Sequence, residues 1–563
     1  MTRTRQSPSS IPTDGSPTAD SGPPLARMSD LHDSPKAPRV LNLGCKVLQL
    51  LFSRNTRYYH SLIRHYFEVS QVCIVPRDFA DKLLHSIVGA DEEHCSCDMG
   101  RDAYLEIAKD ISPSQTSKRP ITDDRSSSSR FFDPFLGENL LCWDGIGILC
   151  ALVASSAMLL PPNSKLLSNA KERDNLISDM AQASSLCVKL CFLRAPINGA
   201  MVLLMYQNFM VISQLYGDTD RRIWMPLVDL VAAVKGSNLD KAETDADMPP
   251  YFVEMRRCLF AAVYSIEQTI CAVRGNPPML NLSSCTQEPP LDIELDVPGY
   301  QRTYPDVDAQ GWSSFGQYCP MTWVRLHYFL SSMHERLLEA TRSRSLDLEI
   351  FEIHAVDDEC VRTWMDLPDH ITHLHTPIDC HTDEQSNHSL LLATAYLDYL
   401  FVRLHANYKL RQYDMSYWLI QQMMITILDT NPRRRDGTSL PRGYSSIVVL
   451  YGVPAAHLLM RIRLLKDTVG GDAGTSWGET IRTLANFIER LDLVIEMQVG
   501  LKDQESDALQ DARDKLVTNF DAIVDRSGAE KNEDGTIERA PWPPAYFDPF
   551  SFYVDLKDDI WRL

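Results

Sequence analysis

The sequence predicts an all-α protein, a multi-helix bundle of antiparallel amphipathic and buried helices with a disordered N-terminal tail. Hydrophobic residues make up 44% of the 563 residues, which is ordinary for a globular protein and enough for a sizeable core. Apolar segments of helical length recur along the chain, and no sustained alternation of apolar and polar residues indicates a strand. Proline, glycine and asparagine separate these segments, as expected of connections between helices.

The first 39 residues are predicted to form the disordered tail or linker. They hold seven serines and seven prolines and almost no large apolar side chains, so they cannot bury enough surface to offset chain entropy. A helical segment is predicted over residues 40–111, where the apolar spacing becomes helical. The polar, serine-rich residues 112–130 are predicted to form a surface loop.

Beyond residue 131, apolar segments predict a series of helices. They cover residues 140–160, 181–193, 199–216, 223–234, 251–273 and 323–342. The longest apolar run, 146–160, is shorter than the 18 or so residues of a membrane span, so we expect a buried helix there and no membrane partner. The segment 199–216 is apolar nearly all round, and Gly217 is placed to cap it.

Residues 254–274 are predicted to form an amphipathic helix that ends at Gly275. Its apolar stripe advances by three or four positions, through Met255, Leu259, Ala262, Ile266, Ile270 and Val273. Four polar residues fall outside the stripe: Arg256, Arg257, Glu267 and Gln268. In residues 481–495 similar spacing lasts about two heptads, which favours packing within a bundle over a coiled coil.

Charge and cysteine content limit the environment of the protein. The net charge is −20, so the chain as a whole repels phosphate backbones, and any DNA contact would need a local basic module. The 14 cysteines are irregularly spaced and no secretory signal opens the chain, which indicates a reducing compartment and mostly buried thiols without disulfides.

From residue 254 the sequence reads EMRRCLFAAVYSIEQTICAVRGNPPML, followed by LDIELDVP from residue 291. This resembles the signature of the fungal-specific transcription factor domain, the helical middle homology region found downstream of fungal binuclear zinc clusters. The matching positions are Glu254, Arg256, Arg257, Leu259, Phe260, Tyr264, Gly275, Pro277 and Pro278. The departures are Cys258, Ala261, Glu267 and Asn276. The alternative interpretation, in which the arginines solvate a helix face and the glycine and prolines stop it, explains each residue but not their order.

The resemblance covers about residues 131–410 and divides the chain accordingly. Residues 131–410 are predicted to be the regulatory domain, and residues 411–523 a C-terminal helical part. Residues 524–563 are predicted to be an acidic-aromatic tail. Two interpretations of the tail stay open, an activation segment that recruits coactivators and a segment whose aromatic side chains dock on the core.

The resemblance implies a nuclear regulator of RNA polymerase II transcription, not an enzyme. The motif residues would maintain the fold, with no catalytic, cofactor-binding or metal-binding role. The partners implied are transcriptional co-regulators or a DNA-binding partner, a second copy of the chain, and a small-molecule inducer held between helices.

The zinc cluster that usually accompanies this domain has no counterpart in the sequence. Such a cluster needs six thiolates in Cys-x-x-Cys-containing halves, and no Cys-x-x-Cys occurs. We expect no cofactor in this chain, and zinc only if a cluster lies upstream. We expect the protein to contact DNA only indirectly, or through an N-terminal module that is missing from this chain.

Other patterns point to competing functions. Ser476 lies in Gly-x-Ser-x-Gly, the nucleophile pattern of hydrolases, but no strand precedes it, and Ser476 with Glu479 fits a helix-capping box. A hydrolase is therefore a remote alternative, and a helical scaffold without a nuclear role is the main one. The densest ligand-capable patch is interpreted as an exposed acidic loop; it holds His370, His373, His375, Cys380 and His381. The arginines at 433–435 are interpreted as a solvated turn.

Overall fold

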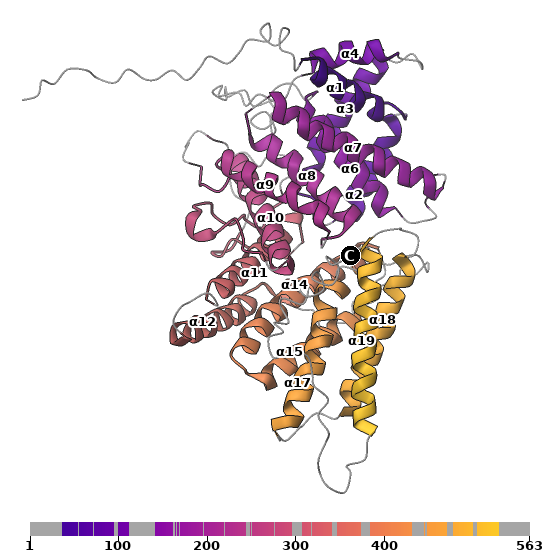
Figure 1. The fold of residues 1–563 in the computed structure, drawn as a ribbon. Helices are drawn as coiled ribbons and strands as arrows, with labels where there is room; N and C mark the ends of the chain where they lie inside the picture. The colour runs from indigo at the N-terminus through magenta and orange to yellow at the C-terminus, as the bar shows by residue number, and fades with distance from the viewer. Residues whose placement is uncertain are drawn as a thin grey trace, which may run out of the picture.

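A computed structural model describes residues 37–528, with gaps at 55, 71, 95–99, 112–140, 161–163, 165, 168, 195, 219, 244–247, 249, 275, 295–306, 317, 341–345, 373–382, 431–443, 445–446, 470–476 and 499–503. The regular secondary structure of these residues is helical (Figure 1). Their one β interaction is an isolated bridge between Val307 and Ser313. The predicted all-α fold is therefore confirmed.

The helices of the described residues are numbered in chain order. They are α1 (Ala37–Leu51), α2 (Thr56–Val69), α3 (Arg77–His94), α4 (Arg101–Asp110), α6 (Trp143–Leu159), α7 (Ala170–Arg194), α8 (Gly199–Tyr216), η3 (Arg221–Ile223), α9 (Trp224–Gly236), α10 (Pro250–Arg274), η4 (Leu282–Ser284), α11 (Pro320–Ala340), α12 (Leu346–Met365), α13 (Asp369–Thr372), α14 (Asp383–Lys409), α15 (Tyr413–Asp429), η5 (Val448–Gly452), α17 (Val453–Val469), α18 (Trp477–Gln498) and α19 (Gln504–Gly528).

Most of the predicted helices appear with small shifts at their ends. Helix α8 has the predicted bounds, and Gly217 caps it with a φ of 78° and an N–H donated to the Ser213 carbonyl oxygen. Helix α7 begins at Ala170, eleven residues before the predicted start. The Asn169 side chain accepts the backbone N–H of Glu172, at 2.9 Å, and so starts α7 through a polar turn that carries no apolar signal.

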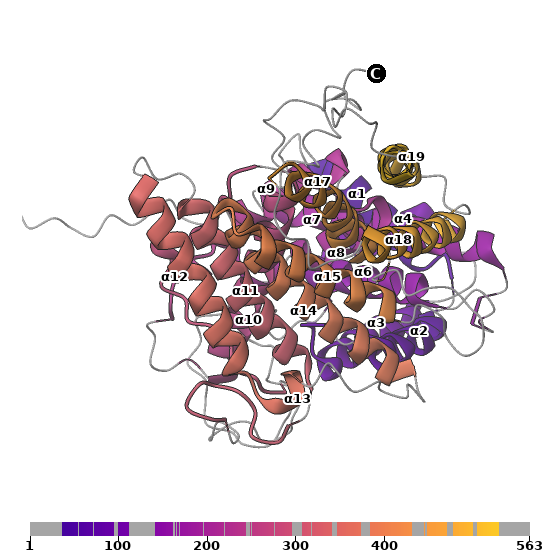
Figure 2. The same cartoon turned by 90° about the horizontal axis from the view of Figure 1, so that it is seen from below.

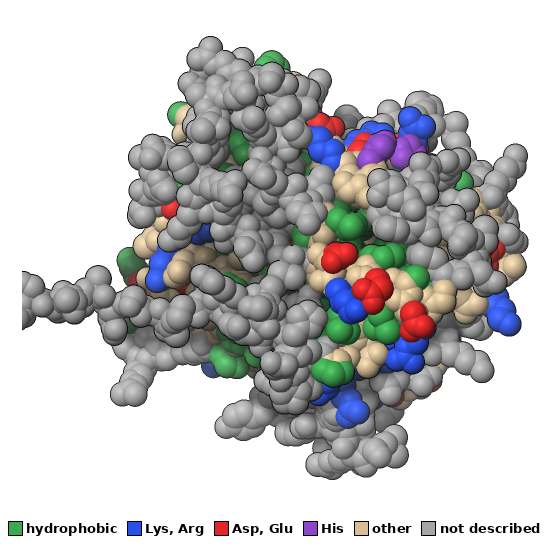
Figure 3. Space-filling model, turned by 90° about the horizontal axis from the view of Figure 1, so that it is seen from above, with side chains coloured by type: hydrophobic (Ala, Val, Ile, Leu, Met, Phe, Trp, Pro, Cys, Tyr) green, Lys and Arg blue, Asp and Glu red, His purple; other side chains and the backbone are tan. Residues whose placement is uncertain are grey.

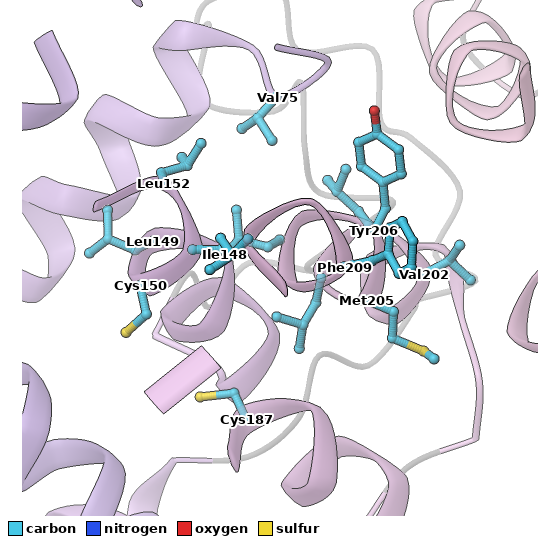
Figure 4. Packing of buried hydrophobic residues seen from close by; sticks show 14 of the residues in the cluster. Val75, Ile148, Leu149, Cys150, Leu152, Cys187, Val202, Met205, Tyr206 and Phe209 are labelled. Atoms are coloured by element: carbon cyan, nitrogen blue, oxygen red, sulfur yellow. The ribbon is translucent and has the colours of Figure 1, made fainter. Parts of the chain in front are cut away.

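The N-terminal half, α1 to α10, surrounds one hydrophobic cluster. Helix α6 lies at its centre and is buried on all sides, as predicted for the longest apolar run. In Figure 4, Ile148 of α6 lies on the side toward Phe209 of α8, and Leu152 of α6 lies near Val75. Gly147 permits this packing, because a Cβ there would lie 2.5 Å from Leu204 and 2.7 Å from the Cβ of Cys187.

The C-terminal half, α11 to α19, surrounds a second cluster. Figure 2 shows α10, α11, α12, α14 and α15 as neighbouring helices, and each of the pairs α10–α11, α11–α12, α11–α14 and α14–α15 is in contact. Helix α11 belongs to both clusters: Met321 and Val324 join the first, whereas Trp323 and Leu330 join the second. The two cores therefore meet along one helix.

A π-helical turn, η5, precedes α17 in the second half. Pro454, in the first turn of α17, has no N–H to offer the preceding turn, which fits the wider turn there. A Cβ on Gly452 would lie 2.4 Å from the ring of Phe487, so α18 approaches η5 closely only because residue 452 is glycine. Helix α18 also contacts α19 and α15, which confirms packing within a bundle.

The described cysteines are all free, and most are buried, as predicted. Burial raises the pKa of the Cys142 and Cys150 thiols to about 12. Within the described part of the chain, residues 170–193 form the one helix that is long and apolar enough to cross a membrane. Half of the apolar window in that helix is buried inside the protein.

Several predictions concern residues outside the described part. These are residues 1–36 of the predicted N-terminal tail, the loop at 112–130, residues 529–563 of the predicted C-terminal tail, Gly275, the arginines at 433–435, Ser476, His373, His375, Cys380 and His381. The remaining tail residues were predicted wrongly, because 37–39 begin α1 and 524–528 end α19. His370 lies in the short helix α13. The other predicted domain boundaries stay predictions.

Candidate functional site: buried carboxylates that hold the segment between α10 and α11

The candidate site lies where α10 and α11 meet the segment that joins them. We define the anchored segment as residues 276–294 and 307–316. Helix α10 is buried on more faces than its apolar stripe predicts. Glu267 and Gln268 fall outside that stripe, yet they are 0% and 1% exposed. Burying a carboxylate costs free energy unless it is hydrogen-bonded, so the partners of these groups determine what the site does.

Glu254, the first signature residue, is fully buried near the start of α10. One carboxylate oxygen accepts a hydrogen bond from the Arg257 guanidinium, with an N–O distance of 3.3 Å. The other oxygen accepts a hydrogen bond from the backbone N–H of Leu291. Burial raises the pKa of Glu254, while the Leu291 N–H and Arg257 oppose that rise. Arg257 also pairs with Glu288. Two signature residues thus fix the middle of the anchored segment to α10.

Asp292, immediately after the residue held by Glu254, is fully buried as well. Its carboxylate accepts the backbone N–H of Ser313 at 3.0 Å and the hydroxyl of Thr322 at 2.5 Å. Its own N–H donates to the Gly311 carbonyl oxygen at 2.9 Å. Asp292 therefore joins both parts of the anchored segment to the start of α11.

Arg325 on α11 is a second, more deeply buried positive charge of this region. It is 4% exposed and donates to the carbonyl oxygens of Pro290 and Gln310. Its guanidinium carbon lies 4.9 Å from the ring centroids of both Trp312 and Phe329. Burial lowers the pKa of Arg325, and the nearby carboxylates Asp292 and Glu254 counteract this. A buried arginine between aromatic rings and carbonyl oxygens serves as a cross-link, because these contacts compensate for its lost hydration.

The C-terminal end of α10 holds the beginning of the anchored segment. Glu267 accepts the backbone N–H of Met279 at 2.5 Å and the Cys271 thiol at 3.3 Å. The Gln268 amide donates to the carbonyl oxygen of Leu280 at 3.0 Å. Burial raises the pKa of Glu267. These contacts explain why two polar side chains of α10 are buried.

Glu335 on α11 completes the arrangement. It accepts the hydroxyl of Tyr264, a signature residue, at 2.5 Å. It also accepts the backbone N–H of Leu282, at 3.0 Å. Burial raises the pKa of Glu335, and both hydrogen bonds lower it. Burial and the negative charge of Glu335 raise the pKa of Tyr264, so its hydroxyl remains a donor.

The remaining signature residues also have structural positions. Arg256 donates to the Asn238 carbonyl oxygen at 2.8 Å and lies 3.6 Å from Glu243, so it is not a solvated surface residue. Leu259 and Phe260 are fully buried. Pro277 is exposed and Pro278 half-buried, at the start of the anchored segment.

The structure thus brings the predicted residues Glu254, Arg257 and Tyr264 to one segment, and it adds residues that the sequence argument missed. Those are Glu267, Gln268, Asp292, Arg325 and Glu335. A signal was present only for Glu267 and Gln268, because they fall beside the apolar stripe of α10, where a buried polar side chain needs a partner. The partners could not be named, because they are backbone groups of a segment without periodicity.

Chemically, the site binds the chain's own backbone. Within the described ranges, no three side chains of histidine, cysteine, aspartate or glutamate gather in a geometry that could hold a metal ion. A separate groove of about 620 Å³ lies between the end of α15 and α18, lined by Leu428, Glu489, Arg490 and Glu496 among others.

No family model, no curated protein and no solved structure matches the chain.

Proposed function

We propose that this chain is the regulatory and effector domain of a transcription regulator of the fungal-specific type, acting on RNA polymerase II transcription in the nucleus. The observation that supports the proposal is the shared task of the signature residues. Glu254, Arg257 and Tyr264 are spread over three turns of α10, yet each is part of the hydrogen bonding that holds the anchored segment. Amphipathic patterning alone does not require residues ten positions apart to serve one segment.

A catalytic role for this region is not part of the proposal. A general acid or base must reach the proton that it transfers. Glu254, Glu267 and Glu335 are at most 5% exposed, and each already accepts a backbone N–H. Their geometry suits a fixed helical frame, which a regulatory domain needs in order to pass a signal between surfaces.

Contact with DNA would come from elsewhere under this proposal. The net charge of −20 opposes binding to phosphate backbones, and the sequence lacks the thiolate spacing of a binuclear zinc cluster. A basic module or a DNA-binding partner would supply the contact. Co-regulators, a second copy of the chain and a small-molecule inducer are the other proposed partners. The charged groove beside α18 would suit a polar inducer.

A tethering experiment tests the proposal. The full chain is fused to a heterologous DNA-binding domain of known operator, and a reporter gene under that operator is measured in a fungal host. We expect the fusion to change reporter output at least severalfold over the DNA-binding domain alone. A tagged chain without the fusion is imaged in parallel, and we expect it in the nucleus.

Two control variants separate the alternatives. Arg325→Met removes the cross-link of the anchored segment and should abolish the reporter effect, whereas Ser476→Ala should leave it unchanged. An unaltered reporter together with purely cytosolic signal would reject the proposal and favour the helical scaffold. Loss of the reporter effect in Ser476→Ala, with normal expression, would instead favour the hydrolase alternative.

A further inference from the structure

Outside the candidate site, two exposed histidines lie face to edge on neighbouring helices. His60 is on α2 and His85 is on α3, and these helices pack against each other. The ring centroids are 6.4 Å apart and the ring planes are at 89°. Figure 3 shows the face seen from above, where two histidine side chains touch each other among charged side chains of both signs.

One of the two rings has a defined tautomer. Nδ1 of His85 lies 2.6 Å from the carbonyl oxygen of Asp81, one turn earlier in α3. Because a carbonyl oxygen only accepts hydrogen bonds, Nδ1 must carry the proton, and Nε2 of the neutral ring keeps its lone pair. Histidines that bind metals are usually oriented in this way, with the other ring nitrogen donating to a carbonyl or carboxylate.

We propose that His60 and His85 form a two-imidazole site for a borderline divalent cation such as Zn²⁺ or Ni²⁺, which would tie α2 to α3. Imidazole nitrogen is a favoured donor for these ions. No third histidine, cysteine or acidic side chain completes a cluster among the described residues, so water fills the other coordination positions.

The rings can share an ion only if His60 reorients, because they meet edge to face and their centroids are too far apart for a common ion. A metal bound through an imidazole nitrogen lies roughly 3.2 Å from the ring centroid, so two rings on one tetrahedral ion have centroids about 5.2 Å apart. The observed 6.4 Å is about 1 Å longer. His60 is exposed and makes no hydrogen bond within the described chain, so its side chain can rotate toward the fixed ring of His85.

Isothermal titration with Ni²⁺ tests the site on the full chain without a polyhistidine tag. The proteins compared are the wild type, His60→Ala, His85→Ala and the double variant, with His354→Ala as the control. His354 is an exposed histidine on α12, far along the chain from the pair. The histidines other than 60, 85 and 354 stay in every variant, so their heat is common to all of the titrations.

We expect each single substitution of the pair to remove one class of Ni²⁺ site or to weaken it roughly a hundredfold, as expected when one of two linked ligands is lost. The double variant should lose no more than either single variant. Ni²⁺ should also raise the thermal midpoint of the wild type and of His354→Ala, but not of the pair variants. Unchanged titration in either His60→Ala or His85→Ala would overturn the proposal. Both side chains are exposed, and circular dichroism checks that the variants fold.

Discussion

Tyr264 on α10 donates its hydroxyl to Oε2 of Glu335 on α11, at 2.5 Å, and Glu335 accepts the N–H of Leu282 as well. One carboxylate thus joins two helices and the segment between them. Glu335→Leu should leave a buried hydroxyl and a partly buried N–H without partners, and we expect a loss of about 2–4 kcal/mol in the free energy of unfolding.

Tyr264→Phe and Glu335→Gln are the matched variants for this prediction. Tyr264→Phe should cost about 1 kcal/mol, and Glu335→Gln should cost less than Glu335→Leu because an amide oxygen still accepts one hydrogen bond. Urea unfolding at pH 7 measures all three. Equal losses for Glu335→Gln and Glu335→Leu would show that an amide oxygen at this position preserves none of the hydrogen bonding, against the prediction.

The same carboxyl should make stability depend on pH. Burial raises the pKa of Glu335 above its ordinary value of 4.5, so the folded protein binds its proton more readily than the unfolded chain. This contribution is fully present below pH 4.5 and is lost as the pH rises through the raised pKa. Relative to Glu335→Gln, the wild type should therefore become more stable as the pH is lowered from 7 to 5. The thermal midpoints of both proteins are measured across this range. The same dependence of the midpoint on pH in both proteins would refute the role of Glu335.

Acid should act in the opposite direction at His457 on α17. Burial lowers its pKa from 6.5 to about 4, so its contribution is present above pH 6.5 and is lost as the pH falls toward 4. We expect the wild type to lose more stability than His457→Leu between pH 7 and pH 5, by on the order of 1–2 kcal/mol. Chemical unfolding at the two pH values measures this difference. A variant as acid-sensitive as the wild type would place the acid response elsewhere.

Gly452→Ala tests the close approach of α18 to η5. The added Cβ would lie 2.4 Å from the Phe487 ring, and overpacking of this kind costs about 1–3 kcal/mol. Gly100→Ala is the control, because a Cβ at that position meets nothing within 4 Å. Differential scanning calorimetry should show a lower midpoint for Gly452→Ala alone.

Arg325→Met should release the anchored segment while α10 and α11 stay helical. The variant keeps the packing volume near Trp312 but loses both carbonyl contacts and the charge beside Asp292. Hydrogen exchange at the amides of Leu291 and Ser313 should accelerate at least tenfold, with Arg325→Lys intermediate. Exchange at Val324, within α11, serves as the internal control and should change little.

Much of the helical frame could be predicted from sequence, because buried helices such as α6 and α8 are apolar over their whole length. The start of α7 could not be predicted in this way, because its first turns are polar and follow the side-chain cap at Asn169. In the candidate site, Tyr264 and Glu254 were predicted to be structural. Leu291, the partner of Glu254, and Leu282, which donates to the Glu335 carboxylate that Tyr264 also contacts, act through backbone N–H groups. Every residue but proline carries such a group, and so no sequence pattern identifies these two leucines.

The double membership of α11 limits how this protein can be divided. A fragment that ended before Pro320 would lack Met321 and Val324 and leave their binding surface in the first cluster exposed to water. A fragment that began at Pro320 would present the same two side chains as an uncovered apolar patch. Neither half should be soluble by itself, and expression trials should keep both halves on one polypeptide.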